Sequence, residues 1–281
     1  MVERNMRSFA RHPFYVDRNA GLIDMITALP YASVVYEFGS GEGAVTELIL
    51  DRTETTTRVY GIEPSAAQIK AAEKRLKGRG DRFIQLIRAK AEDAGQFLEG
   101  KADVAIMCNC IHLIKDKLAV IRSIFNLVED EGQIAINTAF YEPSDATNGW
   151  PRFEGCQPLD SLRFYRRWMS KALRALVRQG LKPRKEERSQ ARNQLTASEY
   201  LDLVEAAGFR VLILSEETAD ITLDGWQDIS KYELFAQGTF PGVPVKAASE
   251  ALQNTVQETL DELGLLFVPR NWLSIVAEKA S

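Results

Sequence analysis

Short apolar runs alternate with amphipathic segments over residues 34–138 of the chain. The runs are predominantly apolar, which is typical of strands that are covered on both faces of a sheet. They lie at 34–38, 58–62, 83–87, 102–108 and 133–138. Segments with helical spacing separate them, most clearly at 66–76 and 118–128. Because strands that alternate with helices build parallel sheets with helices on both faces, this region predicts a doubly wound α/β domain.

The alternation breaks after residue 140, where prolines and glycines give way to an amphipathic helix and then to a highly charged stretch. Regular structure resumes at Thr196, because Thr-Ala-Ser-Glu is a capping box that opens a helix over 198–207. A strand at 209–214 and a last strand at 265–277 follow. We therefore expect four parts: an N-terminal helical lid segment (1–33), an α/β core (34–140), a basic helical insertion that forms a substrate lid (141–195), and a C-terminal completion of the sheet (196–281) with a helical insert at 222–262.

Glycine occupies every second position in the loop after the first predicted strand, at Gly39, Gly41 and Gly43. A loop without side chains between a strand and a helix lets the backbone approach a nucleotide closely. Gly39, Gly41 and Ala44 satisfy the dinucleotide pattern G-x-G-x-x-G/A. Glu37, however, carries a carboxylate two residues before the first glycine. A pyrophosphate ligand would gain nothing from this negative charge, whereas an ammonium group would be attracted to it. The loop alone leaves both a nicotinamide cofactor and an amino-acid-bearing nucleotide open.

A short segment with polar side chains follows each of the next three predicted strands. The residues of these segments are Glu63, Pro64, Ala91, Glu92, Asp93, Asn109 and His112. A carboxylate such as Glu63 can accept hydrogen bonds from both hydroxyls of a ribose. Ligands of open parallel sheets bind outside the carboxyl ends of the strands. We therefore expect these residues to lie along one ligand site.

The acid-x-G-x-G-x-G pattern at 37–43, with the three later strand ends, resembles the class I S-adenosylmethionine-dependent methyltransferases of small-molecule type. The resemblance is close over 34–138 and looser over 196–277. It implies a doubly wound, mostly parallel seven-stranded sheet with helical lid insertions. It also implies that S-adenosylmethionine is the cofactor and S-adenosylhomocysteine the product. The cofactor-binding residues that it implies are Glu37, Gly39, Ser40, Gly41, Gly43, Glu63, Pro64, Ala91, Glu92, Asp93 and Asn109.

His112 lies where this family often places a pocket wall, so it is a candidate general base and, alternatively, a positioning or structural residue. Aromatic side chains suit both a sulfonium cation and a hydrophobic acceptor. The candidates for enclosing the acceptor are Tyr15, His112, Trp150, Phe164, Tyr165, Trp168, Tyr232 and Phe235. Each of them has packing in the protein interior as its alternative role.

The stretch from Arg163 to Arg192 holds eleven basic residues and two acids, in a chain whose net charge is −4. It predicts a helix that begins after Asp160, ends before Gly180, lays an aromatic face over the cofactor pocket and turns arginines outward. The charge fits a solvated helix face, an anionic substrate, or an acidic partner such as a carrier protein or a phospholipid surface. Nucleic acid is disfavoured, because the rest of the chain is acidic and contains no recognised nucleic-acid-binding module.

The composition excludes several classes of protein. With two histidines and three cysteines, and with no Cys-x-x-Cys or H-E-x-x-H, we expect no metal site. The sequence contains no G-x-S-x-G motif, so it lacks the nucleophile elbow of a serine hydrolase. It also contains no window of 18 apolar residues, so we expect no transmembrane helix. We expect a cytoplasmic chain with reduced thiols.

These observations predict a methyltransferase that uses S-adenosylmethionine on the O, N or C atom of a small organic acceptor, with an anionic or carrier-linked molecule among the options. Two alternatives stay open. One is an NAD(P)-dependent oxidoreductase that uses Gly39, Gly41 and Ala44. The other is a catalytically inactive nucleotide-binding protein with the methyltransferase fold.

Overall fold

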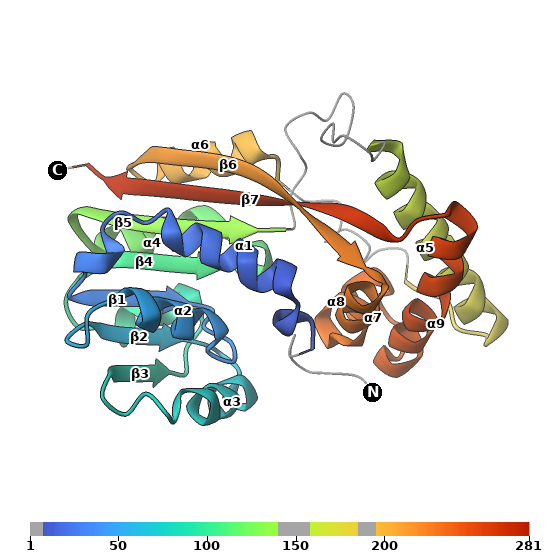
Figure 1. The fold of residues 1–281 in the computed structure, drawn as a ribbon, viewed down its shortest axis with the longest axis horizontal. Helices are drawn as coiled ribbons and strands as arrows, with labels where there is room; N and C mark the ends of the chain where they lie inside the picture. The colour runs from blue at the N-terminus through green and yellow to red at the C-terminus, as the bar shows by residue number, and fades with distance from the viewer. Residues whose placement is uncertain (1–7, 140–157, 185–194, 281) are drawn as a thin grey trace. The chain divides into compact units, whose positions relative to one another are not determined.

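The computed structural model describes residues 8–139, 158–184 and 195–280 (Figure 1). The chain divides into two compact units. The core unit comprises Asp17–Tyr141, Leu195–Glu217 and Trp272–Ser281, and the helical unit comprises Met1–Val16, Glu142–Gln194 and Thr218–Asn271. Three of the divisions fall inside continuous elements, namely α1, β6 and β7.

The described residues form a seven-stranded sheet in the order β3-β2-β1-β4-β5-β7-β6. The strands are β1 (Val34–Phe38), β2 (Arg58–Ile62), β3 (Phe83–Ile87), β4 (Ala102–Cys108), β5 (Val128–Thr138), β6 (Phe209–Thr222) and β7 (Phe267–Lys279). Strands β1 to β5 pair in parallel, and β7 runs antiparallel to β5. The predicted doubly wound, mostly parallel, seven-stranded sheet is confirmed.

Helices cover both faces of this sheet. They are α2 (Ala44–Arg52), α3 (Ala66–Leu76), α4 (Lys117–Leu127), α6 (Ala197–Ala206) and the C-terminal part of α1 (Pro13–Asp24), with short 3₁₀ turns η2 (Leu29–Tyr31), η3 (Ala91–Gln96) and η4 (Ile111–Leu113). Alternate residues of β1 belong to different apolar clusters: Tyr36 packs with residues of α4 and α6, and Val35 packs with residues of α1, α2 and α3. A strand that is buried on both faces explains the continuous apolar runs in the sequence.

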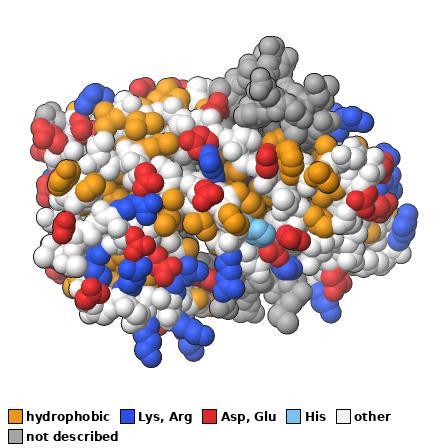
Figure 2. All heavy atoms as spheres, in the orientation of Figure 1, with side chains coloured by type: hydrophobic (Ala, Val, Ile, Leu, Met, Phe, Trp, Pro, Cys, Tyr) orange, Lys and Arg blue, Asp and Glu red, His pale blue; other side chains and the backbone are white. Residues whose placement is uncertain are grey.

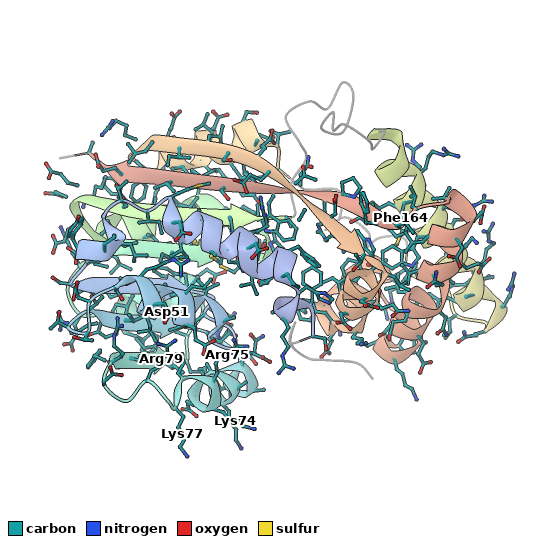
Figure 3. The ribbon with its side chains drawn as sticks, viewed as in Figure 1. Asp51, Lys74, Arg75, Lys77, Arg79 and Phe164 are labelled. Atoms are coloured by element: carbon teal, nitrogen blue, oxygen red, sulfur yellow. The ribbon has the colours of Figure 1, made fainter. Side chains whose placement is uncertain are left out.

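Local side-chain contacts fix where the helices begin and how they pair. The capping box predicted at Thr196 and Glu199 is present at the start of α6. Arg75 and Arg79, on and just after α3, form ion pairs with Glu47 and Asp51 of α2 at 2.8 and 2.7 Å. Lys74 and Lys77 instead point away from the core unit (Figure 3).

Three predicted boundaries are wrong. Strand β5 begins at Val128 rather than at residue 133, and helix α5 (Pro158–Arg178) begins before Asp160 rather than after it. The strand that we expected at 209–214 continues to Thr222. Beyond Leu214 the residues are mostly polar, but their burial still alternates along the strand. Because β6 lies at the edge of the sheet, it can carry polar residues that a central strand would not tolerate.

The described helices of the helical unit are η1 (Phe9–Arg11), the start of α1, α5 (Pro158–Arg178), α7 (Leu223–Lys231), α8 (Glu233–Thr239) and α9 (Val245–Leu263). Their core is aromatic. Phe164 and Trp168 of α5 lie against Trp226 of α7, with ring centroids 5.3 and 5.6 Å apart. The indole N–H of Trp168 donates to the carbonyl of Leu252 in α9 at 3.0 Å. The aromatic face of α5 is therefore packed inside its own unit (Figure 3 labels Phe164).

Candidate functional site

Three positions of the loop between β1 and α2 have backbone angles that favour glycine. Gly39, Gly41 and Gly43 have φ angles of +76°, +53° and +79°, in the left-handed region that other residues rarely adopt. A Cβ atom added at Gly39 would lie 2.7 Å from the Cβ of Cys110. The loop thus packs directly against the segment that follows β4, and it presents backbone rather than side chains at the carboxyl edge of the sheet.

Glu63, at the end of β2, holds this loop in place. Its Oε2 accepts a hydrogen bond from the backbone N–H of Gly41 at 3.2 Å, and its Oε1 accepts one from the N–H of Ser65 at 2.8 Å. Burial raises the pKa of Glu63, and these two backbone hydrogen bonds oppose the rise. Each carboxylate oxygen keeps further lone-pair capacity, so the fixed side chain can also accept from the hydroxyls of a ligand.

Glu37 lies beneath the loop and is only 1% exposed. Its Oε2 accepts a hydrogen bond from the hydroxyl of Thr46, in α2, at 2.6 Å. Burial raises the pKa of Glu37 to about 7; the Thr46 hydrogen bond opposes this, and the nearby charge of Glu63 adds to it. Close to neutral pH the carboxyl group is therefore poised between its two forms. A cation bound at the loop would favour the ionised form.

Ser40 carries a polar atom that no described residue satisfies. The residue is buried, and its Oγ has no hydrogen-bond partner within 8–139, 158–184 and 195–280. This oxygen lies 2.9 Å from where a Cβ on Gly61 would stand, so the glycine in β2 leaves the room that the hydroxyl occupies. A buried hydroxyl without a partner destabilises the protein by about 1–3 kcal/mol. Such a group marks a place where a ligand can supply the missing hydrogen bond.

Asn109 directly follows β4. Its backbone adopts the left-handed conformation, with a φ angle of +50°. Its backbone N–H lies 3.0 Å from both the backbone oxygen and the Oδ1 of Asn137. Its side-chain Nδ2 donates to Oδ1 of Asn19 at 3.1 Å, and its Oδ1 accepts from the indole N–H of Trp272 at 3.2 Å. The amide is held at both ends by the protein, so it acts chiefly by fixing the segment in which it lies.

His112 lies three residues after Asn109, in η4. Its Nδ1 is 3.3 Å from the hydroxyl of Thr138, and the side chain is half-buried. Asn137 and Thr138 are the last two residues of β5, so one strand end contacts both Asn109 and His112.

Sequence reasoning missed four residues of this site, namely Asn19, Cys110, Asn137 and Thr138. Only the pair at the end of β5 carried a signal, because two polar residues close an apolar run there, as they do at the ends of the other strands. The predicted Glu92 and Asp93 lie in the turn η3, which begins four residues after the end of β3, and both are exposed. Their contact with a ligand stays a prediction.

Most of the predicted acceptor-binding residues belong to the helical unit. Phe164 and Trp168 are fully buried there, Tyr15 and Tyr232 are nearly so, and Tyr165 and Phe235 are half-buried. Trp150 lies outside the described residues. Because the rings of Phe164, Trp168 and Trp226 fill the space between one another, they present no open wall in this structure. Contact of these residues with an acceptor stays a prediction.

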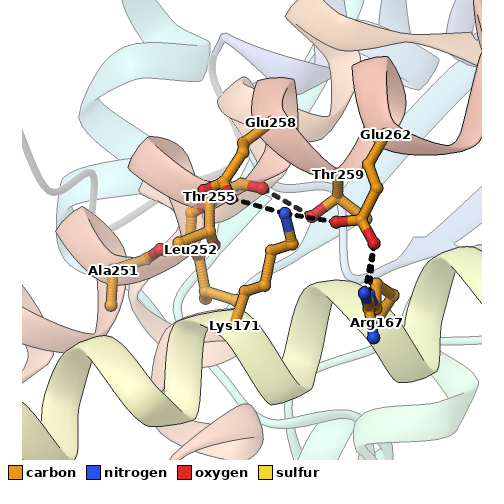
Figure 4. Close-up of polar contacts among 8 residues, drawn as sticks. All are labelled: Arg167, Lys171, Ala251, Leu252, Thr255, Glu258, Thr259 and Glu262. Carbon is orange, nitrogen blue, oxygen red and sulfur yellow. Dashed lines mark hydrogen bonds and ion pairs between the residues drawn. The ribbon is translucent and has the colours of Figure 1, made fainter.

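Ion pairs within the helical unit use part of the basic charge of α5. Arg167 and Lys171 face Glu258 and Glu262 of α9 (Figure 4). Lys171 Nζ lies 2.6 Å from a carboxylate oxygen of each, and Arg167 Nε donates to Glu262 at 2.7 Å. Hydrogen bonds from these two cations lower the pKa of Glu262 to about 2.

The other basic side chains on the described part of α5 are exposed, at Arg163, Arg166, Arg174 and Arg178. Residues 185–192 of the basic stretch lie outside the described residues. On the face seen in Figure 2, acidic and basic side chains are intermixed.

Among the residues that the structure describes, no group of three or more His, Cys, Asp or Glu side chains could hold a metal ion. None of the helices described is long and apolar enough to cross a membrane.

Comparisons with known proteins agree with this geometry. Residues 36–134 match the family model of a methyltransferase domain. No curated protein sequence matches the chain. Among solved structures, a protein from Bacillus halodurans that is assigned as a methyltransferase is 13% identical, with a TM-score of 0.59, over 94% of this chain and 100% of that one.

Two further solved structures share the fold. A geranyl diphosphate methyltransferase in complex with geranyl diphosphate and sinefungin is 14% identical, with a TM-score of 0.54, over 94% of this chain and 78% of that one. The [4+2]-cyclase SpnF is 14% identical, with a TM-score of 0.55, over 94% of this chain and 81% of that one. At such identities these likenesses show the fold, whereas the match to the family model is confined to residues 36–134. The chain therefore has the fold of the class I methyltransferases, and its residues 36–134 match the family model of a methyltransferase domain.

Proposed function

We propose that this chain is an enzyme that transfers the methyl group of S-adenosylmethionine to a small organic acceptor. The observation that carries the proposal is the glycine loop with its orphaned Ser40 hydroxyl, set between the carboxylates of Glu37 and Glu63 within a methyltransferase domain. The geranyl diphosphate methyltransferase that shares this fold, in complex with geranyl diphosphate and sinefungin, supports the same use of the site.

The residues at the edge of the sheet fit each part of this cofactor. Glu63 offers lone pairs to the ribose hydroxyls, and the Ser40 hydroxyl gains the partner that it lacks. Glu37 supplies negative charge beneath the backbone on which the methionine ammonium would rest. Glu92 and Asp93 follow β3 at an exposed turn, where a carboxylate can accept from the amino group of adenine.

The cofactor supplies a methyl group on a sulfonium, and transfer is an in-line displacement by a lone pair or carbanion of the acceptor. Proximity and orientation then supply much of the acceleration. The remaining task of the protein is to take the proton of an O–H or N–H acceptor. His112 could do so through Nε2 in the tautomer in which its Nδ1–H donates to Thr138.

An anionic acceptor is the version of this proposal that the charges favour. The neighbouring enzyme with geranyl diphosphate acts on an anion. In the present chain, α5 carries exposed arginines in addition to the cations that form ion pairs with Glu258 and Glu262. A panel of acceptors matched in shape but differing in charge tests this version. Equal turnover of charged and neutral members would remove it and leave methyl transfer untouched.

Methyl transfer itself needs a test, because the fold also serves a [4+2]-cyclase. Titration calorimetry with S-adenosylmethionine, S-adenosylhomocysteine and NAD separates the candidate functions. We expect the two sulfur ligands to bind and NAD not to bind. Binding of NAD alone at micromolar concentration would establish the oxidoreductase alternative. Cofactor binding without a methylated product across the acceptor panel would favour the inactive nucleotide-binding alternative.

A further inference from the structure

A single carbonyl oxygen joins helix α1 to the ends of two neighbouring strands. Oδ1 of Asn19 accepts from Nδ2 of Asn109 at 3.1 Å and from Nδ2 of Asn137 at 3.0 Å. Asn109 follows β4 and Asn137 lies near the end of β5. Asn19 is 1% exposed, so water does not compete for these hydrogen bonds. The shared oxygen lies at the carboxyl edge of the sheet, where the proposed cofactor site is.

The conformation that this oxygen supports is not one that the backbone prefers. Asn109 has φ +50°, which an asparagine tolerates better than most residues but which still needs support from its surroundings. Its N–H is bonded to Asn137 and its Oδ1 to the indole of Trp272. A buried polar network of this kind is rigid only while every member is satisfied. Loss of Asn19 would leave the Nδ2 groups of Asn109 and Asn137 without their shared acceptor.

The segment that Asn109 begins also contacts the glycine loop. Cys110 packs against Gly39, and its Sγ–H donates to the carbonyl of Phe38 at 3.1 Å. His112 follows within the same turn. A shift of Asn109 would therefore move the thiol that supports the loop and the imidazole that we propose near the acceptor.

We propose that Asn19 is a positioning residue for the methyl-transfer site: it holds segment 109–113 against the glycine loop through its hydrogen bonds to Asn109 and Asn137. The proposal rests on the proposed function, because that function makes this segment part of the cofactor site. Asn19 lies on α1, outside the region that carries the sequence motifs.

The chain offers a matched control. Gln133 is another buried amide that ties the N-terminal segment to β5: its Nε2 donates to Thr27 at 2.9 Å, and its Oε1 accepts from the N–H of Ala28 at 3.0 Å. It lies five residues before Thr138, away from the carboxyl end of the strand. A change at Gln133 removes comparable buried hydrogen bonds without touching segment 109–113.

The test compares Asn19→Ala, Asn19→Asp and Gln133→Ala by thermal unfolding, by amide hydrogen exchange of residues 109–113 without ligand, and by calorimetry with S-adenosylhomocysteine. We expect Asn19→Ala to speed exchange in the segment and to weaken binding, each by about tenfold or more, because a buried network loses its common acceptor. Asn19→Asp keeps a carbonyl-type acceptor and should recover most of both. Gln133→Ala should lower the melting temperature while leaving both within about threefold of wild type.

Equal changes in Asn19→Ala and Gln133→Ala would show that Asn19 only stabilises the fold, and would overturn the proposal. So would an Asn19→Asp variant as impaired as Asn19→Ala. If Asn19→Ala does not fold, Asn19→Ser, which keeps a small polar group too short to reach both amides, takes its place. If wild-type protein binds no S-adenosylhomocysteine, the proposed function fails. The exchange comparison in the ligand-free proteins still decides whether Asn19 positions the segment.

Discussion

Gly39 and Cys110 interlock: a Cβ on Gly39 would stand 2.7 Å from the Cβ of Cys110 and 2.9 Å from its sulfur. The loop after β1 and the segment after β4 are therefore built to one another's shape. Burial raises the pKa of the Cys110 thiol well above its usual range, with the carboxylates of Glu63 and Glu37 adding to the effect. The thiol therefore acts as a small packing group that donates to Phe38, rather than as a nucleophile.

Gly39→Ala should destabilise the protein through two separable effects. The left-handed backbone costs an alanine roughly 1–2 kcal/mol, and overpacking against Cys110 adds about 1–3 kcal/mol. Gly100→Ala is the matched control, because Gly100 also has a positive φ, of +82°, but no atom of the described residues lies within 4 Å of its Cβ position. Urea unfolding should place the loss for Gly39→Ala clearly above that for Gly100→Ala. Equal losses would mean that Cys110 moves aside freely.

Glu37 should make the stability of the ligand-free protein depend on pH. Its pKa is raised from 4.5 to about 7, so the folded state binds the proton more tightly than the unfolded chain does. The stability that this group contributes is fully present below about pH 4.5 and is lost as the pH rises through about 7. At about 1.4 kcal/mol for each tenfold change in proton affinity, the loss is on the order of 3 kcal/mol.

Glu37→Gln keeps an acceptor for Thr46 and removes the titration. Denaturant unfolding at pH 5 and pH 8 should show a smaller fall in stability with pH for this variant than for wild type. If stability falls with pH as much in Glu37→Gln as in wild type, a group other than Glu37 causes the pH dependence. Calorimetry of S-adenosylmethionine at pH 7 in buffers of different ionisation enthalpy should also detect proton release in wild type and less in the variant, because the bound ammonium favours the ionised carboxylate.

Ser40→Ala should separate folding from binding. The Oγ of Ser40 is buried without a partner among the described residues, so its removal should raise the stability of the ligand-free protein by about 1–3 kcal/mol. The same change should weaken S-adenosylhomocysteine, because the ligand loses a hydrogen bond. Thr46→Val is the contrasting variant, since it removes a hydroxyl that already donates to Glu37, and it should lower stability. An affinity unaffected by Ser40→Ala would remove Ser40 from the ligand site.

Glu63→Ala should weaken cofactor binding by more than about 1 kcal/mol, the scale of a hydrogen bond to a charged group. The variant also frees the N–H groups of Gly41 and Ser65, so the loop loses part of its support. Glu47→Ala is the control, because it removes a partly exposed carboxylate that pairs with Arg75 on the helix side. If calorimetry gives the same cofactor affinity for Glu63→Ala and wild type, the Glu63 carboxylate does not bind the ribose.

His112→Ala should lower kcat more than it lowers cofactor affinity if the imidazole is a general base. Thr138→Val leaves the ring in place and removes the hydroxyl near Nδ1, so it should reduce kcat by a smaller factor and alter its pH profile. Equal losses in kcat and affinity for His112→Ala would make His112 a residue that positions the cofactor. Steady-state kinetics over a range of pH, combined with calorimetry, provides both quantities.

The sequence by itself determined the parts of this protein that depend on neighbouring residues. Apolar runs and helical spacing located the strands of the sheet, because periodicity follows directly from backbone geometry. The glycines at 39, 41 and 43 predicted a loop with special backbone angles, and all three have positive φ. Thr196 and Glu199 predicted a capping box that the structure contains, since its two hydrogen bonds join residues only three apart.

The tertiary structure decided what depends on residues far apart in the chain. Asn19, Asn109 and Asn137 span more than a hundred positions, and no local pattern signals that one oxygen serves two amides. The helical spacing of Phe164 and Trp168 predicted an apolar face but not its neighbour, which proved to be Trp226 and α9. Likewise, the glycine pattern identified Glu37 as a site residue, but it is burial in the folded protein that raises the pKa of Glu37 to about 7. Periodicity fixes which face of an element is apolar, whereas long-range packing determines what that face meets and how much water remains around each charge.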